Sequence, residues 1–283
     1  MHLDSRGPGW LDLPRNPPGP CHLASATFFL NPFLFKALLM EQRKQSDFKE
    51  TLKTVLIAVL IALGVRTVAY EPFNIPSGSM IPTLLVGDYL FVSKYSYGYS
   101  SFSLPFSLPL IKGRIFYSEP KRGDVMVFKL PTDTSIDYIK RIIGLPGDTV
   151  QLKNSVLYIN DKPVKREKVD DFIAPNGIGN YDRTPRYKET LANGKSYFTL
   201  EVTDKTIFDN TAVYTVPEDH FFAMGDNRDR SKDSRYLDDV GFIPRNNLVG
   251  RAEFLFFSVN GSVWEFWNWG KTLRLNRFYQ GIE

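Results

Sequence analysis

The longest uninterrupted run of apolar residues in this chain extends from Thr54 to Val65, twelve residues without a charge. After Arg66 the apolar character continues to Tyr70, which makes 17 residues in all. That length is at the lower end of the roughly 17–25 residues that a membrane-spanning helix needs. Arg66 lies near the end of the run, where a long side chain can extend to the lipid headgroups. The pattern therefore predicts a transmembrane helix over residues 54–72.

Two other interpretations of this apolar run are open. A helix in the core of a soluble domain would be expected to have a polar face, and this run has none. A cleaved signal peptide would have small residues at its exit site, and Thr67-Val68-Ala69 matches that pattern only weakly. An uncleaved anchor explains the run better than either alternative.

Basic residues determine the expected orientation of the helix. Lys44, Lys49 and Lys53 precede the apolar run, and cytoplasmic flanks of membrane helices carry an excess of such residues. We therefore expect residues 40–53 to form a cytoplasmic flank. Everything after Glu71 would then lie outside the cytoplasm.

Residues 1–39 resemble nothing further along the chain. The stretch from Asp4 to Pro20 is rich in Pro and Gly, and the apolar stretch from Ala24 to Met40 is interrupted by Asn31-Pro32 and Lys36. It could be a first membrane segment, but it is short and has proline inside it. We expect these residues to be a start-site artefact or an unstructured extension.

After the anchor the hydrophobic pattern becomes that of short β-strands, rich in β-branched and aromatic residues and bounded by turn residues. A hairpin is expected within Val150–Val164, with a turn at Asn160–Pro163. Residues 165–196 are polar and read as loops and ribbon edges. The remaining expected strands are Tyr89–Val92, Asp124–Phe128, Phe198–Val202, Ala212–Val216, His220–Met224 and Ala252–Val259.

These elements predict a mainly β protein after the membrane helix. Residues 73–150 and 219–283 would form an antiparallel β core, and residues 151–218 an inserted β-ribbon module. A length of 283 residues is compatible with one or two domains. The net charge of +4 is mild, and no basic block marks a nucleic-acid surface. The single cysteine, Cys21, excludes an intrachain disulfide.

The segment Asn74–Thr83, just after the apolar run, is the strongest candidate for chemistry. It places the hydroxyls of Ser77 and Ser79 on either side of Gly78, between two prolines that restrict the backbone. Glycine allows a sharp turn and leaves backbone N–H groups free. A serine held in this way can attack a carbonyl while neighbouring donors stabilise the oxyanion. The alternative is a loop of Ser, Gly and Pro with no chemistry.

A nucleophilic serine needs a base, and histidine is the usual one. The chain has three histidines, of which His2 and His22 lie on the other side of the anchor. His220 begins an apolar strand, where a structural role is expected. Histidine is therefore a poor candidate.

Lys140 is the other candidate base. Strand alternation places it on one face with Ile136, Tyr138 and Ile142. An ammonium on an apolar face loses hydration, which lowers its pKa. The alternative is a lysine whose stem packs while its amine reaches solvent. Arg141, on the opposite face, is expected to be a structural charge.

The block Gly225–Arg235 is rich in charges of both signs. It resembles a calcium loop, but an EF-hand needs glutamate at position twelve and Leu237 stands there. We therefore expect no metal and no cofactor. Ion pairs and Asx turns would hold this loop, leaving Ser231 free to donate to a neighbouring amine.

Taken together, these segments resemble the sequence boxes of the bacterial type I signal peptidases, the leader peptidases that use a Ser/Lys dyad. The boxes occur in the family order and cover about Thr54 to Arg251. Any one box is weakly specific, and the set is highly specific. The matching segments are Phe73–Leu84 with Gly87-Asp88, Lys121–Val125, Tyr138–Arg141 with Gly144–Asp148, Gly225–Asp229 with Ser231 and Asp233–Arg235, and Gly241–Pro244.

This resemblance implies a role for each matching residue. Ser79 would be the nucleophile and Lys140 the general base. The Ser77 hydroxyl and the backbone N–H of Ser79 would form the oxyanion hole. Ser231 would orient the lysine amine, with Asp233 and Arg235 holding the geometry. The expected substrate pockets are formed by Phe73, Ile75, Met80, Leu84, Tyr138 and Ile139.

The resemblance also implies an enzymatic activity and a cellular location. The chain would be a serine endopeptidase of the bacterial inner membrane that cleaves signal peptides from exported preproteins after small residues, through an acyl-enzyme. Its partners would be signal peptides, membrane lipid and the protein translocation machinery. Two features depart from the family pattern: a long linker between Arg235 and Gly241, and no disulfide pair in the inserted module.

Two rival functions are considered. A Ser/Lys self-cleaving repressor-type peptidase would share the core, but it would carry a DNA-binding domain, of which the sequence has no sign, and would need no anchor. An anchored β-domain could instead bind a partner through its aromatic tail, which contains Trp264, Phe266, Trp267 and Trp269. We expect this tail to contact the bilayer, because tryptophan is favoured at membrane interfaces. The alternative is that these rings belong to the core.

Overall fold

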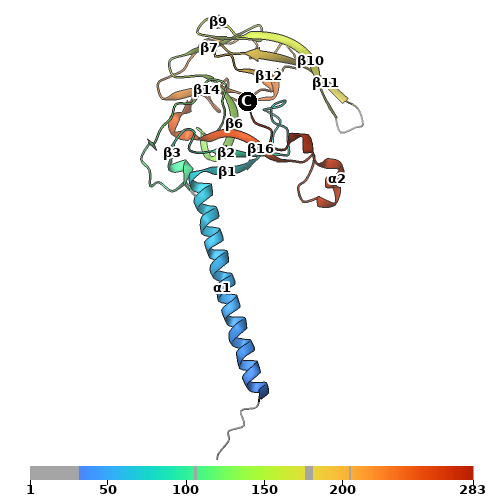
Figure 1. Ribbon diagram of the computed structural model, residues 1–283. Coiled ribbons are helices and arrows are strands. Elements are labelled where there is room, and N and C mark those ends of the chain that lie inside the picture. The colour runs from blue at the N-terminus through green and yellow to red at the C-terminus, as the bar shows by residue number, and fades with distance from the viewer. Residues whose placement is uncertain (1–31, 105–106, 176–180, 204, 283) are drawn as a thin grey trace, which may run out of the picture. The chain divides into compact units, whose positions relative to one another are not determined.

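A computed structural model describes residues 32–104, 107–175, 181–203 and 205–282 (Figure 1). The chain divides into two compact units between Leu56 and Ile57. Helix α1 (Pro32–Val68) runs through this boundary. It begins at Pro32, and proline suits the first helical position because its missing N–H would have no partner there.

The helix corrects two expected boundaries. Residues 32–39 are helical, so the expected unstructured extension is wrong for them, while residues 1–31 lie outside the described residues. At its other end the helix stops at Val68, and residues 70–72 belong to strand β1 (Tyr70–Asn74) instead of to the membrane helix. The segment Phe48–Val68 is long and apolar enough to cross a membrane, and none of it is buried in protein.

The rest of the chain is built on a seven-stranded sheet of order β1-β2-β16-β5-β6-β14-β15, with antiparallel pairing throughout. This confirms a mainly β fold. Besides β1, its strands are β2 (Asp88–Ser93), β5 (Val125–Leu130), β6 (Asp133–Gly144), β14 (His220–Met224), β15 (Ile243–Pro244) and β16 (Leu248–Ser258). A small pair, β3 (Tyr99–Ser100) and β4 (Arg114–Ile115), lies outside this sheet.

Two further sheets come from residues 149–215, close to the expected inserted module. One has the order β13-β7-β8-β9 and the other the order β10-β11-β12. The first consists of β7 (Thr149–Lys153), β8 (Val156–Ile159), β9 (Lys162–Pro163) and β13 (Tyr214–Thr215). The second consists of β10 (Lys165–Pro175), β11 (Tyr181–Thr190) and β12 (Ser196–Leu200).

The module has more strand than its sequence pattern predicts. The segment expected to be loops and ribbon edges contains the long strands β10 and β11, which pair with each other (Figure 1). They carry polar residues and are largely solvated, so they lack the alternation that marks a half-buried strand. The expected hairpin is a three-stranded meander, because Asn154 and Ser155 form an additional turn with positive φ.

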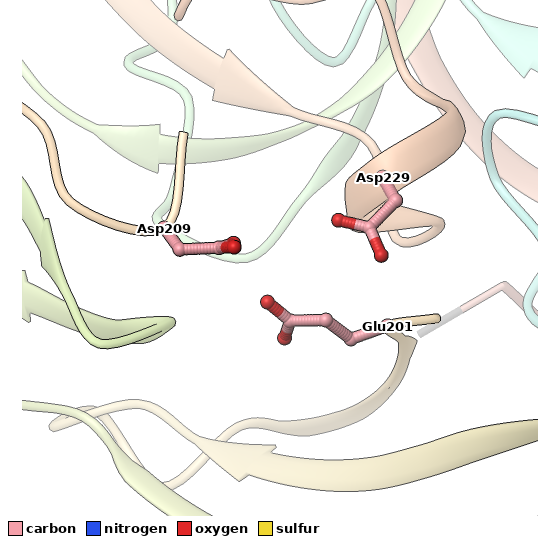
Figure 2. A group of neighbouring side chains, drawn as sticks. All are labelled: Glu201, Asp209 and Asp229. Atoms are coloured by element: carbon pink, nitrogen blue, oxygen red, sulfur yellow. The ribbon is translucent and has the colours of Figure 1, made fainter. Parts of the chain in front are cut away.

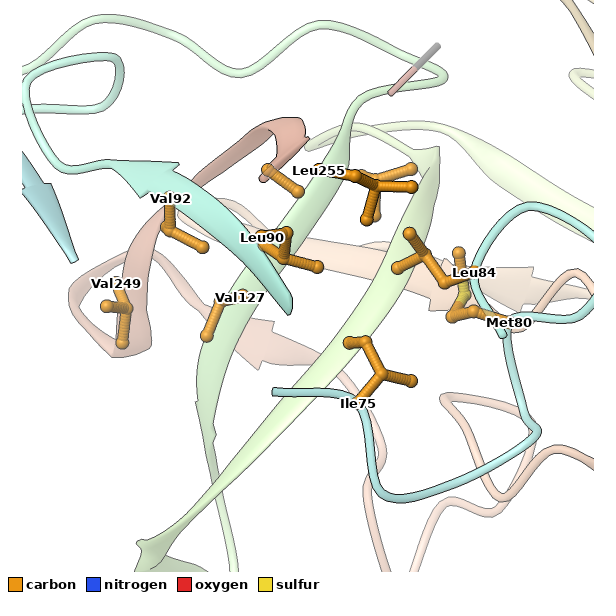
Figure 3. Close-up of a cluster of buried hydrophobic side chains, with 10 residues drawn as sticks. Ile75, Met80, Leu84, Leu90, Val92, Val127, Val249 and Leu255 are labelled. Atoms are coloured by element: carbon orange, nitrogen blue, oxygen red, sulfur yellow. The ribbon is translucent and has the colours of Figure 1, made fainter. Parts of the chain in front are cut away.

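Three clusters of buried side chains form the core. The first, drawn in Figure 3, packs Ile75, Met80 and Leu84 against residues of β2, β5 and β16. Another of these clusters joins Phe222 and Met224 of β14 to residues of β7, β8 and β12. The inserted module therefore shares a core with the main sheet, which fixes its position next to the loop that follows β14.

Short 3-10 helices and one short α-helix complete the described chain. They are η1 (Ser101–Ser103), η3 (Arg228–Arg230), η4 (Arg245–Asn247), η5 (Phe266–Asn268), α2 (Trp269–Thr272) and η6 (Leu275–Arg277).

Candidate active site

The loop that carries Ser79 leaves β1 and returns to β2. Two backbone hydrogen bonds close its base: Ile75 N donates to Asp88 O and Gly87 N donates to Ile75 O, each at 2.9 Å. Ile75, Met80 and Leu84 anchor its apolar side chains in the core. Ser79 is therefore held on a loop whose flanking residues are packed, and its own side chain is buried.

Asn227, which follows β14, clamps this loop from the other side. Its side-chain amide donates to Gly78 O and its backbone N–H donates to Ser79 O, each at 3.0 Å. Gly225 allows this close approach, because a Cβ at that position would lie 2.5 Å from Ser79 O. Reasoning from the sequence missed Asn227, since its partners lie about 150 residues earlier in the chain.

Lys140 lies on β6 and faces Ser79. Its Nζ donates to Ser79 Oγ at 2.8 Å and to the carbonyl of Ile139 at 2.9 Å. Only 4% of the residue is exposed, and the amine lies 5.1 Å from the centre of the Tyr138 ring. The expected alignment of Lys140 with an apolar strand face is thus present, and the amine does not reach solvent.

Burial lowers the pKa of Lys140 to about 8, because desolvation disfavours the ammonium. The carboxylates of Asp233 and Asp226 oppose this change, and Arg235 adds to it. Compared with an ordinary lysine of pKa about 10.4, of which far less than a hundredth is deprotonated at pH 7, about a tenth of Lys140 is therefore the free amine. That is the form that can accept a proton from a hydroxyl.

Two donors could face an oxyanion formed at Ser79. The Ser77 side chain is exposed, with its Oγ 3.5 Å from Ser79 Oγ. Within the described residues the backbone N–H of Ser79 donates no hydrogen bond. A free amide beside a buried hydroxyl is the arrangement that an oxyanion hole requires.

Ser231 differs from its expected role. Its Oγ is buried, but it has no partner with full hydrogen-bond geometry among the described residues, so it does not bond to the Lys140 amine. The hydroxyl is close enough to Asp233 to contribute to that group's lowered pKa.

Asp233 and Arg235 form a buried ion pair beneath the site. The guanidinium donates to both carboxylate oxygens, at 2.8 and 2.9 Å, and Gly225 N also donates to Asp233. Burial would raise the pKa of Asp233, but Arg235 and the hydrogen bonds to the carboxylate outweigh it and hold the pKa below its usual value. The pair fixes the loop after β14, as expected for residues that hold geometry.

A second buried pair joins Arg141 to Asp226. The guanidinium donates from Nε and Nη2 to the two carboxylate oxygens, each at 2.8 Å, and both side chains are almost completely buried. Thr83, on the serine loop, donates to Asp226 at 2.5 Å. Arg141 is therefore a structural charge on the strand face opposite Lys140, and it ties β6 to the serine loop.

Ser79 and Lys140 open into a cleft of about 810 Å³. Four of the six expected pocket residues line it: Phe73, Ile75, Tyr138 and Ile139. Met80 and Leu84 do not, which corrects the expectation for them: their side chains turn inward and are fully buried in the core below the loop (Figure 3).

His220 is not among the residues that line the cleft. Its Nδ1 lies 2.7 Å from the carbonyl of Glu218. Among the described residues, a candidate metal cluster of Glu201, Asp209 and Asp229 is also distinct from the cleft lining.

Comparisons with known proteins identify the family of this chain. The family model for signal peptidase, peptidase S26, matches residues 48–257. Signal peptidase I of Rickettsia typhi is 42% identical over 253 residues, covering 83% of this chain and 94% of that protein. Signal peptidase I of Rickettsia conorii is 43% identical over 243 residues, covering 79% of this chain and 89% of that protein. A crystal structure of signal peptidase I from Enterococcus faecalis is 28% identical, with a TM-score of 0.27, and covers 47% of this chain and 97% of that one.

Proposed function

The chain belongs to the signal peptidase family, peptidase S26, and is a serine endopeptidase of that family; we propose that it cleaves signal peptides from exported preproteins with Ser79 as nucleophile and Lys140 as base. The observation that carries these assignments is the 2.8 Å distance between Lys140 Nζ and Ser79 Oγ, both buried at the base of the cleft. The preprotein is the substrate class implied by the signal peptidase relatives.

In the proposed reaction Ser79 Oγ attacks the carbonyl carbon of the scissile peptide bond. The neutral amine of Lys140 takes the hydroxyl proton as the new C–O bond forms. The lysine then delivers this proton to the leaving nitrogen as the C–N bond breaks, which leaves the acyl-enzyme. A water molecule, deprotonated by the same amine, then attacks the ester carbonyl; the C–O bond to Ser79 breaks, and Lys140 returns the proton to Ser79 Oγ.

The supporting residues act through position and charge. The Ser79 N–H and the Ser77 hydroxyl would stabilise the oxyanion that develops on the attacked carbonyl. Asn227 would keep that amide in place by holding the carbonyls of Gly78 and Ser79. Asp233 and Arg235 would fix the loop after β14, and Ser231 would contribute to its packing.

The cleft wall supports selection of small residues before the cut. An extended peptide alternates its side chains, so the first and third positions before the cut point the same way. The apolar wall of Phe73, Ile75, Tyr138 and Ile139 would leave shallow pockets for them.

Replacing alanine by phenylalanine at the first or third position of a preprotein should therefore lower kcat/KM by about 10- to 100-fold, the cost of about 1–3 kcal/mol for forcing a large group into a filled space. The matched control is phenylalanine at the second position, whose side chain points away and should have little effect. Cleavage rates of these peptides by the detergent-solubilised enzyme test the idea. Efficient cleavage after Phe or Leu would contradict it.

We further propose a bacterial inner-membrane location, with the N-terminus in the cytoplasm and the catalytic part outside it. The apolar segment Phe48–Val68 supports an anchor, and the preceding lysines support this orientation. Such an arrangement places the cleft on the side where an exported preprotein emerges. The protein translocation machinery is a further proposed partner.

The aromatic tail supports direct contact with lipid. Trp264, Phe266 and Trp267 are 82, 68 and 69% exposed, so they do not belong to the core. Trp269 differs, since its ring packs 5.3 Å from that of Phe257 and its Nε1 donates to a backbone carbonyl. Exposed tryptophans are favoured at the level of the headgroups.

In vesicles, brominated lipid should therefore quench the tryptophan fluorescence of the wild-type protein more strongly than that of a Trp264→Ala/Trp267→Ala variant. Trp269→Phe serves as the control, because its ring packs on protein and its loss should leave most of the quenching. If iodide in the water quenches the wild type while brominated lipid has no effect, the tail lies in solvent and the proposal of lipid contact is wrong.

A further inference from the structure

Three carboxylates meet where the β12–β13 connection of the inserted module contacts η3. Glu201 follows β12, Asp209 lies in the connection to β13, and Asp229 lies in η3 (Figure 2). One oxygen of each group lies within 4.8 Å of the others, and Figure 2 shows the three carboxyl groups facing one another. Glu201 and Asp209 are 3% and 2% exposed, and Asp229 is half-buried.

Each carboxylate uses one oxygen for a protein contact. Glu201 Oε2 pairs with Arg166, and Asp209 Oδ2 accepts the backbone N–H three residues before it. Asp229 Oδ2 accepts the two amides that follow Glu201, at 2.6 and 3.0 Å. Among the described residues, the second oxygen of each group accepts no hydrogen bond in full geometry. Three oxygens thus remain for a ligand.

An unpartnered hydroxyl, that of Ser155, is directed at the same place. Ser155 is completely buried, and its Oγ has no hydrogen-bond partner with full geometry. Its backbone N–H donates to the carbonyl of Asp209 at 2.9 Å, which brings the β7–β8 turn against the cluster. The Ser155 hydroxyl lies close enough to the Glu201 carboxyl to favour its ionised form, so it faces the cluster. A buried hydroxyl without a partner is costly and calls for an acceptor or a cation.

The charges of the cluster do not balance. If all three carboxylates are ionised they carry −3, and with +1 from Arg166 the cluster holds −2; burial raises the pKa of Glu201 to about 7, so near neutral pH protonation removes part of this charge when no cation is bound. Arg228 also acts on Glu201, but it donates to both carboxylate oxygens of Glu189, at 2.8 and 2.6 Å, and is neutralised there. A buried excess of two negative charges is strongly unfavourable without a counter-charge.

We propose that Glu201, Asp209, Asp229 and Ser155 bind one calcium ion. Oxygen ligands and a charge of −2 suit a divalent hard cation. Ca²⁺–O distances of about 2.3–2.6 Å allow ligand oxygens to lie up to about 5 Å apart across the ion, whereas Mg²⁺–O distances of about 2.1 Å allow only about 4 Å. Oxygens within 4.8 Å of one another lie inside the range for calcium, which also accepts less regular ligand sets than magnesium does.

This site departs from the expectation of no metal in the block Gly225–Arg235. That expectation concerned a single contiguous loop, in which the EF-hand pattern fails. Here the block supplies one ligand, Asp229, and the others come from two other segments. The ion would tie the β12–β13 connection and the β7–β8 turn to η3, which lies between Asn227 and Ser231 in the loop beside Ser79.

The test is calorimetric titration of the full chain in detergent, stripped of metal with EDTA, with CaCl2. One ion per chain is expected, with a Kd no weaker than the ~10⁻⁴–10⁻³ M typical of extracytoplasmic modules, and Mg²⁺ at least tenfold weaker. Asp209→Asn keeps a side-chain oxygen that can accept the backbone N–H three residues before it, but it removes one negative charge. This variant should therefore bind calcium at least tenfold more weakly. Glu218→Gln, an exposed carboxylate outside the cluster, is the matched control and should bind as the wild type does.

A thermal unfolding series gives an independent readout. Calcium should raise the Tm of the wild type and of Glu218→Gln, and should leave that of Asp209→Asn nearly unchanged. Without calcium, Asp209→Asn should be at least as stable as the wild type, because repulsion in the cluster is relieved. Absence of saturable binding to the wild type, or equal binding by Asp209→Asn, would overturn the proposal; the wild-type measurements decide it even if the variant does not fold.

Discussion

Ser79→Ala and Lys140→Ala should each lower kcat for preprotein cleavage by about 10⁴–10⁶-fold, because a nucleophile and its base act as one unit. For the same reason the double variant should be no worse than either single one. Ser77→Ala should be milder, at about 10²–10³-fold, as for the loss of one oxyanion donor. The measurement is the single-turnover cleavage rate of a preprotein by the detergent-solubilised enzyme.

His220→Ala is the matched control for these variants. The imidazole bonds to a backbone carbonyl and is not part of the cleft wall, so its removal should change cleavage little. An inactive His220→Ala together with an active Lys140→Ala would exclude the Ser/Lys mechanism. A binding protein without peptidase activity would show no cleavage that depends on Ser79.

The pH profile gives the same mechanism a second test. Burial lowers the pKa of Lys140 to about 8, and the free amine is the form that accepts the serine proton. As the pH falls through 8 the ammonium returns and the base is lost, so kcat/KM should fall on the acid side and rise with pH through this value. His220→Ala should keep that acid limb. An acid limb that disappears in His220→Ala would contradict the assignment of Lys140 as base.

The residues found from sequence are those whose chemistry is visible in a short segment. Two hydroxyls around Gly78 between prolines mark the loop, and the period of two on β6 places Lys140 on an apolar face. Both features depend on residues within about ten positions of each other. The pairing of the two groups, 61 residues apart, followed only from the family resemblance.

The residues that were missed depend on contacts between distant segments. Asn227 donates a hydrogen bond to the carbonyl of Gly78, which lies 149 residues earlier in the sequence. Asp226 accepts a hydrogen bond from Thr83, which lies 143 residues earlier. The local sequence pattern around each residue does not indicate which distant segment it will bond to. The inward turn of Met80 and Leu84 was missed for a related reason, since the direction of a loop side chain depends on the core beneath it.

Strand pairing explains the difference in the inserted module. β10 and β11 are long, but their polar residues face solvent, and a solvated ribbon gives no hydrophobic period. Their strand character comes from hydrogen bonds to each other, which sequence pattern does not record. The carboxylates of Glu201, Asp209 and Asp229 are brought together only by the fold, because no local sequence pattern places them side by side.

Removing one partner of the buried pair of Arg141 and Asp226 should strongly destabilise the catalytic part. Asp226→Ala would leave a completely buried guanidinium without its carboxylate, which costs about 3–5 kcal/mol. The guanidinium would keep other contacts, among them the ring of Tyr197 at 4.2 Å, the carbonyl of Gly123 and the hydroxyl of Thr83, but it would lose the carboxylate to which both Nε and Nη2 donate. The free energy of unfolding in urea, measured on the detergent-solubilised protein, should fall by this amount.

Asp219→Ala is the matched control, because it breaks a pair of similar length, 2.9 Å to Arg245, that is exposed to solvent. Exposed pairs contribute under about 1 kcal/mol, and alanine at the left-handed backbone of Asp219, with φ of 59°, adds a cost of about 1 kcal/mol, so this variant should lose less than about 2 kcal/mol. Combining Asp226→Ala with Arg141→Met should recover part of the loss, since removing both charges leaves no unpaired ion in the core. If Asp226→Ala is no less stable than Asp219→Ala, the pair does not hold the serine loop to β6, and the position of Ser79 must depend on Asn227 and the packed residues of the loop.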